Sequence, residues 1–298
     1  MSIFYLSILL FYQISLTLCT KNLQSNNHIP LSVSCPALSG SSIKKARALA
    51  ELLHLPFRGY SEPFHGITLI YTDNHLELHH NHTAGKADQG PIFVDFLSGT
   101  SGYRRLHTCT VRQPLARAVG IKQGFRPSIV DGTAGLGQDG FVLSCLGCNV
   151  TMIERSPVLG ALLSDGLERA LQDRIVGKIV KDRITLIVAD TITVLETLTP
   201  RPYTVYLDPM YPRRTKSALN KKEMRIIRTL VGDDQDSSSL LECALKSAEN
   251  RVVVKRPKEA PPLAGLSPSH EILMKNSRFD VYLTHFAGPD HADKTPSE

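Results

Sequence analysis

The stretch Ser128-Ile-Val-Asp-Gly-Thr-Ala-Gly-Leu-Gly-Gln-Asp-Gly140 sets the architecture expected of this chain. Ile129 and Val130 are typical of the end of a buried parallel strand, and the apolar run that starts at Phe141 predicts an amphipathic helix. The glycines between them permit positive φ and close approach of a ligand to the backbone, and the helix start offers unpaired N–H groups. Strand, glycine-rich turn and helix together predict the first part of a nucleotide-binding βαβ unit.

Length and charge indicate the kind of partner. The 298 residues can bury a full α/β domain and a smaller one, and the net charge of +6 favours an anionic partner. The basic residues are concentrated in two blocks. Residues 100–126 contain six basic side chains and no acidic one, and residues 213–228 contain seven with a single glutamate. Such blocks indicate nucleic acid, and the side chains expected to bind it are Arg104, Arg105, Arg213, Arg214, Lys221 and Lys222.

The sequence predicts no metal site. Cys145-Leu-Gly-Cys148 has zinc or redox spacing, but no second pair and no suitably spaced histidine accompanies it, so we interpret both cysteines as packing residues. Four histidines lie at positions 75, 79, 80 and 82. Their alternation is typical of an exposed strand face, and no cysteine or acidic cluster completes a site.

The predicted domains are three. Residues 1–30 form a hydrophobic extension outside the fold, because the apolar segment is short for a membrane span and lacks the basic start of a signal peptide. Residues 31–110 predict a small α/β domain, with strands at 31–35, 67–71, 75–79 and 91–96 and a helix from a Ser42 cap to Leu53. Residues 111–298 predict the nucleotide-binding domain, with a short helix at 113–119, further strands at 149–154, 183–190, 203–207 and 251–256, a helix at 239–248 and a final hairpin at 270–283.

The second predicted strand of the large domain ends in a carboxylate. Glu154 follows Asp131 by 23 residues, which is where βαβ folds place the acid that accepts hydrogen bonds from a ribose. The alternative is that Glu154 caps the helix predicted after Ser156 and Pro157.

A later strand carries a second motif. Tyr203-Thr-Val-Tyr-Leu-Asp-Pro-Met-Tyr-Pro212 ends a hydrophobic strand in Asp-Pro-Met-Tyr, which resembles the Asp/Asn-Pro-Pro-Tyr/Phe motif of amino-group methyltransferases. A conjugated exocyclic amine is a poor nucleophile, so its lone pair must be aimed at the methyl donor. The Asp208 carboxylate and the Pro209 carbonyl group can accept its N–H groups, and Tyr211 can stack on the base. These three are the predicted catalytic residues.

In combination the motifs resemble one family. Gly90-Pro-Ile-Phe-Val-Asp-Phe96, the turn from Asp131 to Asp139, Met152-Ile-Glu-Arg155, Tyr206 to Pro212, Lys216 to Arg225 and Val252 to Pro257 are similar to the bacterial small-subunit rRNA guanine-N2 methyltransferase J family. The resemblance covers residues 31–283. It implies a class I methyltransferase fold, Rossmann-like with a seven-stranded sheet, which uses S-adenosylmethionine. It also implies methyl transfer to N2 of one guanine near the 3′ end of 16S rRNA, in the cytoplasm, with 16S rRNA or the small ribosomal subunit as partner.

By position the resemblance also implies the cofactor contacts. They are Asp131, Gly135, Gln138, Asp139, Glu154, Arg155, Asp190, Thr191 and Asp208. Two positions depart from the family pattern, which commonly has arginine at Gln138 and a small hydroxyl residue at Asp190.

Two other classes of function remain open. The first is another amino methyltransferase, acting on adenine N6 in DNA or on a protein amide, because Asp-Pro-x-Tyr motifs serve these substrates as well. The second is a non-catalytic RNA-binding or ribosome-assembly protein on the same scaffold. The presence of both Glu154 and Asp208 argues against the second class, because a binding module needs neither.

Overall fold

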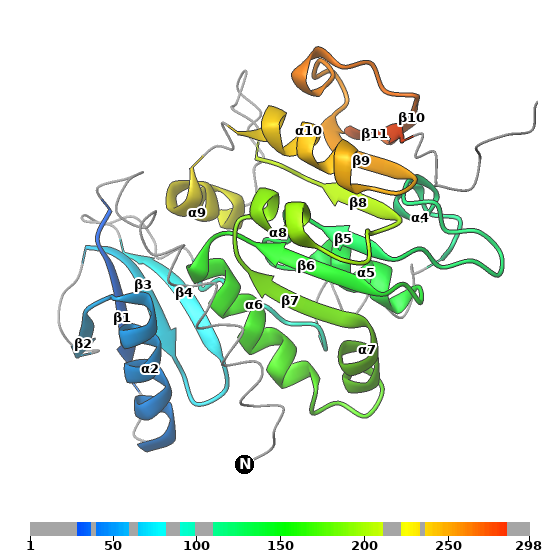
Figure 1. Ribbon diagram of the computed structural model, residues 1–298. Helices are drawn as coiled ribbons and strands as arrows, with labels where there is room; N and C mark the ends of the chain where they lie inside the picture. Colours follow the sequence, from blue (N-terminus) through cyan, green and yellow to red (C-terminus); the bar gives the residue numbers. More distant parts are fainter. Residues whose placement is uncertain are drawn as a thin grey trace, which may run out of the picture.

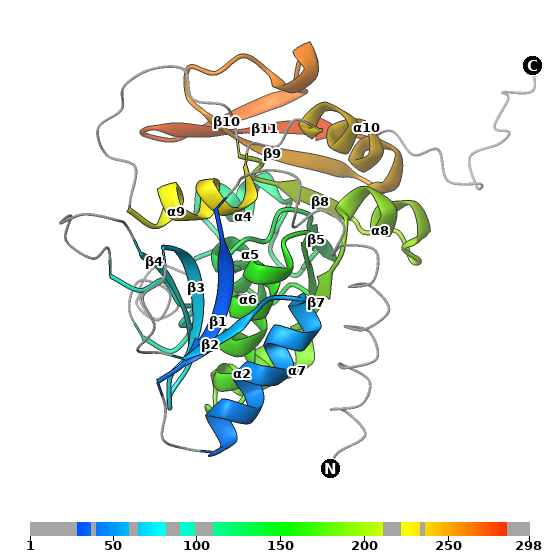
Figure 2. The same ribbon diagram turned by 90° about the vertical axis from the view of Figure 1, so that its left-hand side faces the viewer.

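The computed structural model describes residues 29–36, 40–59, 65–81, 90–98, 110–210, 222–232 and 236–284. Two β-sheets lie on either side of one helix, α6 (Pro157–Ala170), and both views show the small sheet beside α6 and below α9 (Lys222–Val231) (Figures 1 and 2). Most of the predicted N-terminal extension falls outside the described residues. Within them, no helix combines the length and the apolar character of a transmembrane span.

The small sheet has the order β2-β1-β3-β4. Parallel pairing joins β1 to β2 and β3, and β3 and β4 form an antiparallel hairpin. The hairpin turns at Thr72, whose hydroxyl group accepts the N–H of His75 (3.0 Å) and donates to the His75 carbonyl oxygen (2.8 Å). The bounds are β1 (Leu31–Cys35), α2 (Gly40–Leu53), β2 (Phe57–Gly59), β3 (Gly66–Tyr71) and β4 (Leu76–Asn81).

Two predictions for this part of the chain are wrong. Ser42 does not cap α2, because the helix already begins at Gly40 and the Ser42 hydroxyl donates to Asp73 Oδ1 (3.5 Å) from inside the helix. Residues 91–96 form no strand and make only a bridge between Ile92 and Leu78. The apolar residues alternate because this extended segment packs on α6, and its chain then turns where Asp95 accepts the N–H of Leu97 (2.8 Å).

The large sheet has the order β10-β11-β9-β8-β5-β6-β7. Five neighbouring strands are parallel, and β11 is antiparallel to both β9 and β10. This confirms the seven-stranded sheet and its terminal hairpin. The bounds are β5 (Ile129–Asp131), β6 (Val150–Glu154), β7 (Ile184–Val188), β8 (Thr204–Leu207), β9 (Arg251–Pro257), β10 (His270–Leu273) and β11 (Ser277–Leu283).

Helices cover both faces of the large sheet (Figure 1). On β8, Tyr206 faces a core cluster that it shares with Phe141 of α5, whereas Val205 faces a second cluster with Leu241 of α10. The second face carries α8 (Thr191–Thr197) and α10 (Ser237–Ser247), with the short 3₁₀ helix η2 (Leu263–Gly265) beside α10. The first face carries α4 (Pro114–Ala118), α5 (Gln138–Cys145), α6 and α7 (Val176–Arg183).

The helix after the glycine turn differs from the prediction in its start and in its burial. Helix α5 begins at Gln138 instead of Phe141, and its residues from Gly140 to Ser144 are all buried. It is enclosed because it contacts both β6 and α7, and Phe96 stacks on Phe141 with 4.5 Å between ring centroids. Cys148, just beyond α5, is buried in the same core, and burial raises the pKa of its thiol to about 11.

The two sheets share one core cluster through α6, which contacts β4, β6 and β7. Helix α6 packs tightly at Gly166, where a Cβ atom would overlap the side chain of Val94. Buried side chains from both sides of residue 110 thus pack together in one core. The domain boundary predicted near this residue stays a prediction.

Candidate active site

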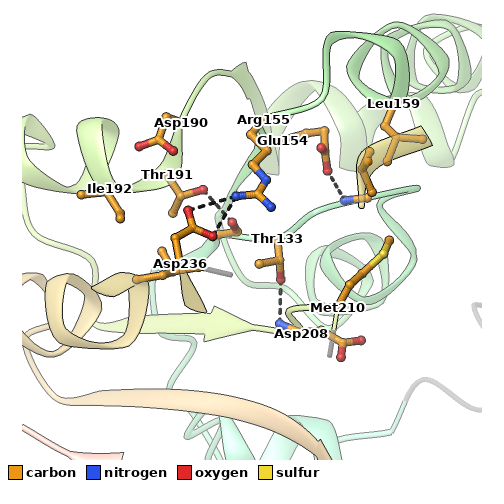
Figure 3. A pocket seen from close by; sticks show the side chains of 14 residues that line it. Thr133, Glu154, Arg155, Leu159, Asp190, Thr191, Ile192, Asp208, Met210 and Asp236 are labelled. Carbon is orange, nitrogen blue, oxygen red and sulfur yellow. Dashed lines mark hydrogen bonds and ion pairs between the residues drawn. The ribbon is translucent and has the colours of Figure 1, made fainter. Parts of the chain in front are cut away.

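Charged side chains meet at the carboxyl edge of the parallel strands. Asp131 ends β5, Glu154 ends β6, Asp208 follows β8 and Lys255 lies near the end of β9. Parallel strands bring these ends to one edge, where open α/β sheets bind their ligands. A pocket opens at this edge (Figure 3). It is lined by Gly132, Thr133, Gly135, Glu154, Arg155, Leu159, Asp190, Thr191, Ile192, Asp208, Met210, Val231, Asp236 and Leu240.

The glycine turn after β5 is held by the neighbouring strands. The N–H of Gly132 donates to the Tyr206 carbonyl oxygen (2.9 Å), and the Gly132 carbonyl oxygen accepts the Thr191 hydroxyl (2.6 Å). A Cβ atom at Gly132 would lie 2.8 Å from Thr191 Cγ2 and 2.9 Å from Leu207 Cδ2, so a larger residue would have to displace these side chains. The turn therefore forms a fixed floor for the pocket.

Glu154 links this turn to the following helix. Its Oε2 accepts the N–H of Gly135 (2.7 Å), and its Oε1 accepts the N–H of Ser156 (2.7 Å), the N-cap residue of α6. The carboxylate is buried but lines the pocket (Figure 3). The cap of α6 is the Ser156 hydroxyl group, which accepts the N–H of Leu159 (3.4 Å), so Glu154 holds the cap residue without being the cap, and its ribose contact stays a prediction.

An ion pair crosses the pocket. Arg155 Nη1 donates to both carboxylate oxygens of Asp236 at 3.0 Å, and this pair joins the end of β6 to the start of α10 (Figure 3). Asp190 lies on the pocket wall as the N-cap of α8, where its Oδ1 accepts the N–H of Thr193 (3.0 Å).

Asp131 lies beneath the pocket. It is 2% exposed, and its Oδ1 accepts the N–H of Thr133 (3.3 Å). Burial raises the pKa of its carboxyl group to about 8, and the negative charges of Asp139, Asp208 and Glu154 add to this rise. Asp131 is therefore mostly protonated at neutral pH.

Beside the pocket, one ammonium group holds two carboxylates. Lys255 Nζ lies 2.8 Å from Asp208 Oδ2 and 3.0 Å from Asp139 Oδ2. Asp139 Oδ2 also accepts the hydroxyl group of Tyr206 (2.7 Å). The backbone N–H of Asp208 donates to Thr133 Oγ1 (2.6 Å), so both the main chain and the side chain of Asp208 are fixed.

The structure brings most of the predicted cofactor contacts together. Six of them line the pocket: Gly135, Glu154, Arg155, Asp190, Thr191 and Asp208. Asp131, Gln138 and Asp139 do not, and their cofactor contacts stay predictions that this geometry does not support. Pro209 is buried next to Asp208, and its carbonyl contact also stays a prediction. Outside the described residues lie Tyr211, Arg104, Arg105, Arg213, Arg214 and Lys221, while Lys222 begins α9 with its side chain undescribed.

Sequence reasoning missed two charged residues of the site. Lys255 follows three valines at the end of β9, as Asp131 and Glu154 follow apolar residues on their own strands, and this signal could have found it. Asp236 gives no such signal, because its place opposite Arg155 depends on how α10 packs.

The chemistry of the pocket lining suits S-adenosylmethionine. Apolar side chains such as Leu159, Ile192 and Leu240 offer a wall for a planar base, while Glu154 and Asp190 offer acceptors for hydroxyl and ammonium groups. For metal ions, the described ranges contain no group of three or more His, Cys, Asp or Glu side chains placed to hold one. His75 and His79 instead contact Glu77 at 2.9 and 2.7 Å.

Replacement of Glu154 is expected to weaken cofactor binding. Glu154→Ala removes a charged acceptor that lines the pocket and releases Gly135, so the dissociation constant for S-adenosylmethionine should rise about 10- to 100-fold. Glu154→Gln keeps one oxygen acceptor and should show a smaller rise. Titration calorimetry on the folded variants measures both. Unchanged affinity in Glu154→Ala would contradict the ribose assignment and leave Glu154 as a cap.

Comparison with known proteins agrees with this geometry. A family model described as putative SAM-dependent methyltransferase matches residues 50–284. Ribosomal RNA small subunit methyltransferase J of Desulfotalea psychrophila is 49% identical over 260 residues, which cover 87% of this chain and 99% of the relative. The protein of the same name from Thioalkalivibrio sulfidiphilus is 53% identical over 244 residues, covering 81% and 93%.

A solved structure supports the same conclusion. The SAM-dependent methyltransferase NGO1261 from Neisseria gonorrhoeae is 32% identical, with a TM-score of 0.64, and the match covers 88% of this chain and 99% of that one. These similarities confirm the predicted fold class, the methyltransferase activity and S-adenosylmethionine as the cofactor. The chain belongs to the ribosomal RNA small subunit methyltransferase J family of SAM-dependent methyltransferases.

Proposed function

We propose that this enzyme transfers the methyl group of S-adenosylmethionine to the exocyclic N2 of a single guanine near the 3′ end of 16S rRNA. The observation that carries the proposal is the position of Asp208, which lines the cofactor pocket and is held by Thr133 and Lys255. The relatives named above act, by name, on small-subunit ribosomal RNA.

Asp208 has to prepare the acceptor amine. The lone pair of a guanine N2 is delocalised into the base, so a carboxylate that accepts an N–H turns the nitrogen toward the methyl donor. When bound, the cofactor would supply an electrophilic methyl group on a sulfonium, whose S–C bond breaks as the N–C bond forms and leaves a neutral thioether. The nitrogen loses a proton as the new N–C bond forms, and the Asp208 carboxylate can take it. No strong base is needed, because the proton becomes acidic only when that bond forms.

The other pocket residues would hold the cofactor. Glu154 would accept the ribose hydroxyl groups, and Arg155 would cover the pocket together with Asp236. Asp190 and Thr191, at the start of α8, would lie beside the base. Asp208 would then separate the cofactor from the acceptor guanine.

The RNA side of the proposal rests on charge. One of the two basic blocks directly follows the predicted catalytic motif in sequence, the other directly precedes the glycine turn, and Tyr211 would stack on a guanine turned out of its loop. The substrate would be 16S rRNA or the small ribosomal subunit, which places the reaction in the cytoplasm.

A methyl-transfer assay with three acceptors tests the proposal. With tritiated S-adenosylmethionine, label is expected in 16S rRNA or small subunits, and not in DNA or ribosomal protein. Mass spectrometry of the labelled RNA should then find N2-methylguanosine at one site near the 3′ end. Asp208→Ala serves as the inactive control. Label in DNA or in protein alone would overturn the proposal in favour of another amino methyltransferase, and no label in any acceptor would favour a binding protein.

A further inference from the structure

We propose that Lys255 is a positioning residue for methyl transfer, whose ammonium group keeps the Asp208 carboxylate ionised and oriented toward the acceptor amine. The inference rests on the proposed function and extends it to a residue outside the cofactor pocket. It follows from the register of two strands, from the contacts of the ammonium group and from the charges that surround Asp208.

Strand register brings the two groups together. In the parallel pair β8–β9, Leu207 lies opposite Val254, so the next residues along both strands are Asp208 and Lys255. Side chains of neighbouring strands at the same register point to the same face. The resulting contact between Lys255 Nζ and Asp208 Oδ2 is 2.8 Å long. It joins residues far apart in sequence and is set by the fold alone.

Asp139 fixes the other side of the ammonium group. Its Oδ2 lies 3.0 Å from Lys255 Nζ and accepts the hydroxyl group of Tyr206 at 2.7 Å. Tyr206 is fully buried, and burial raises the pKa of its hydroxyl group well above the usual value, so the group stays a proton donor. Lys255 is therefore anchored through α5 to the same strand that carries Asp208, which limits the movement of its long side chain.

Acidic groups surround Asp208 and its ammonium partner. Lys255 is a cation that the described structure places against Asp208, and the acidic groups nearby include Asp131 and Asp139, with the Tyr206 hydroxyl group among them. Burial alone would lower the pKa of Lys255, but the carboxylates of Asp208 and Asp139 outweigh that effect and raise it. The ammonium group thus stays charged throughout the neutral range, and its charge offsets the carboxylates of Asp208 and Asp139.

The location of Lys255 also separates its role from cofactor binding. Neither Lys255 nor Asp139 lines the pocket, whereas Asp208 does. Figure 3 shows the Asp208 carboxylate pointing away from the Arg155–Asp236 pair. Loss of Lys255 should therefore act on Asp208 and leave the cofactor contacts at Glu154 and Arg155 in place.

Without the ammonium group, Asp139 and Asp208 become neighbouring like charges. Two carboxyl groups this close usually hold one proton between them, because ionisation of the second adds negative charge to a site that is already negative. A protonated Asp208 keeps one oxygen acceptor but loses its charge and cannot take the proton of the amine, so it orients the amine less well. Activity should then return as the pH rises and the second carboxyl group ionises.

Four variants test the inference. Lys255→Met keeps much of the side-chain volume without the charge, and Lys255→Arg keeps the charge. Lys255→Met combined with Asp139→Asn removes one charge of each sign, while the acceptor for Tyr206 remains. Lys258→Met, an exposed lysine beyond β9, is the matched control. Single-turnover rates on the RNA substrate are measured from about pH 5 to about pH 9, together with cofactor affinity and thermal unfolding.

The expected pattern is specific. At neutral pH, Lys255→Met should lower the rate of methyl transfer about 10- to 100-fold, with nearly unchanged cofactor affinity. The acidic limb of its pH–rate profile should move to higher pH by about one to two units. Lys255→Arg should recover most of the rate, the double variant should return the limb toward its original position, and Lys258→Met should behave as the wild type.

The opposite results would overturn the inference. An unmoved acidic limb in Lys255→Met, or a loss in Lys255→Arg as large as in Lys255→Met, would show a structural role only. If Lys255→Met does not fold, the double variant and Lys255→Arg still decide, because both preserve the charge balance. A wild type that labels no RNA would instead count against the proposed function, which separates the two failures.

Discussion

Asp208→Ala is expected to lower the rate of methyl transfer by more than about 100-fold, the size of effect found when an oriented group at a reacting centre is removed. The substitution takes away the acceptor for the amine and the partner of Lys255, but the backbone contact from residue 208 to Thr133 Oγ1 remains. The strand end should therefore keep its place while the chemistry fails. Asp208→Asn retains one oxygen acceptor and should keep part of the activity.

Single-turnover kinetics at saturating cofactor, with binding measured separately, distinguish these effects. Because Asp208 lines the pocket, a moderate loss of cofactor affinity is expected in both variants. Asp182→Ala, an exposed aspartate on α7, is the matched control and should be silent. Near-normal rates in Asp208→Ala would remove Asp208 from the mechanism, and an equal loss in Asp208→Asn and Asp208→Ala would assign the function to its charge alone.

Asp131→Asn is expected to stabilise the protein at alkaline pH. The folded-state pKa of Asp131 is about 8, whereas an exposed aspartate has a pKa of about 3.9. Between these values the folded protein binds more protons than the unfolded chain, so the free energy of unfolding falls as the pH rises through this window. The slope from this one group is at most about 1.4 kcal/mol for each pH unit. The asparagine variant has no such slope. At pH 8 its free energy of unfolding should therefore exceed that of the wild type by roughly 2–5 kcal/mol.

Urea unfolding of the wild type and the variant across this pH range checks the expectation. The difference between the two proteins isolates Asp131, because all other titrating groups are common to both. Asp131→Ala also removes the slope but leaves a cavity. It should therefore have a lower free energy of unfolding than Asp131→Asn at every pH. Parallel curves for the wild type and Asp131→Asn would mean that Asp131 is already ionised in the folded state at neutral pH.

Much of the sheet could be predicted from local sequence. The runs that end in Asp131, Glu154 and Asp208 are apolar and β-branched, and each becomes a buried parallel strand with its acid at the carboxyl edge. Residues 91–96 show where the same pattern misleads. Their alternation of buried and exposed side chains arises from packing on α6, and a pattern of period two does not reveal whether a partner strand is present.

The contacts of Lys255 with Asp208 and Asp139 could not be predicted from local sequence, for a different reason. The contact between Lys255 and Asp208 depends on which residues of β8 and β9 face each other, and the contact with Asp139 depends on where α5 begins. The apolar run places the start of α5 at Phe141, three residues after its start at Gln138, and the cofactor contact of Asp139 is implied only by the family resemblance. Asp236 likewise meets Arg155 only through the packing of α10.

The strand order of the large sheet has a consequence for the nascent chain on the ribosome. Strand β11 lies between β9 and β10 and pairs with β9 along its whole length, from Ser277 opposite Pro257 to Leu283 opposite Arg251. Until residues 277–283 have left the exit tunnel, the strand that carries Lys255 has an open edge, and an open edge is a template for wrong pairing. The glycine turn, Glu154 and Asp208 are all synthesised earlier. All residues that line the cofactor pocket are therefore synthesised before β11, the strand that covers the free edge of β9 and so completes the surroundings of Lys255.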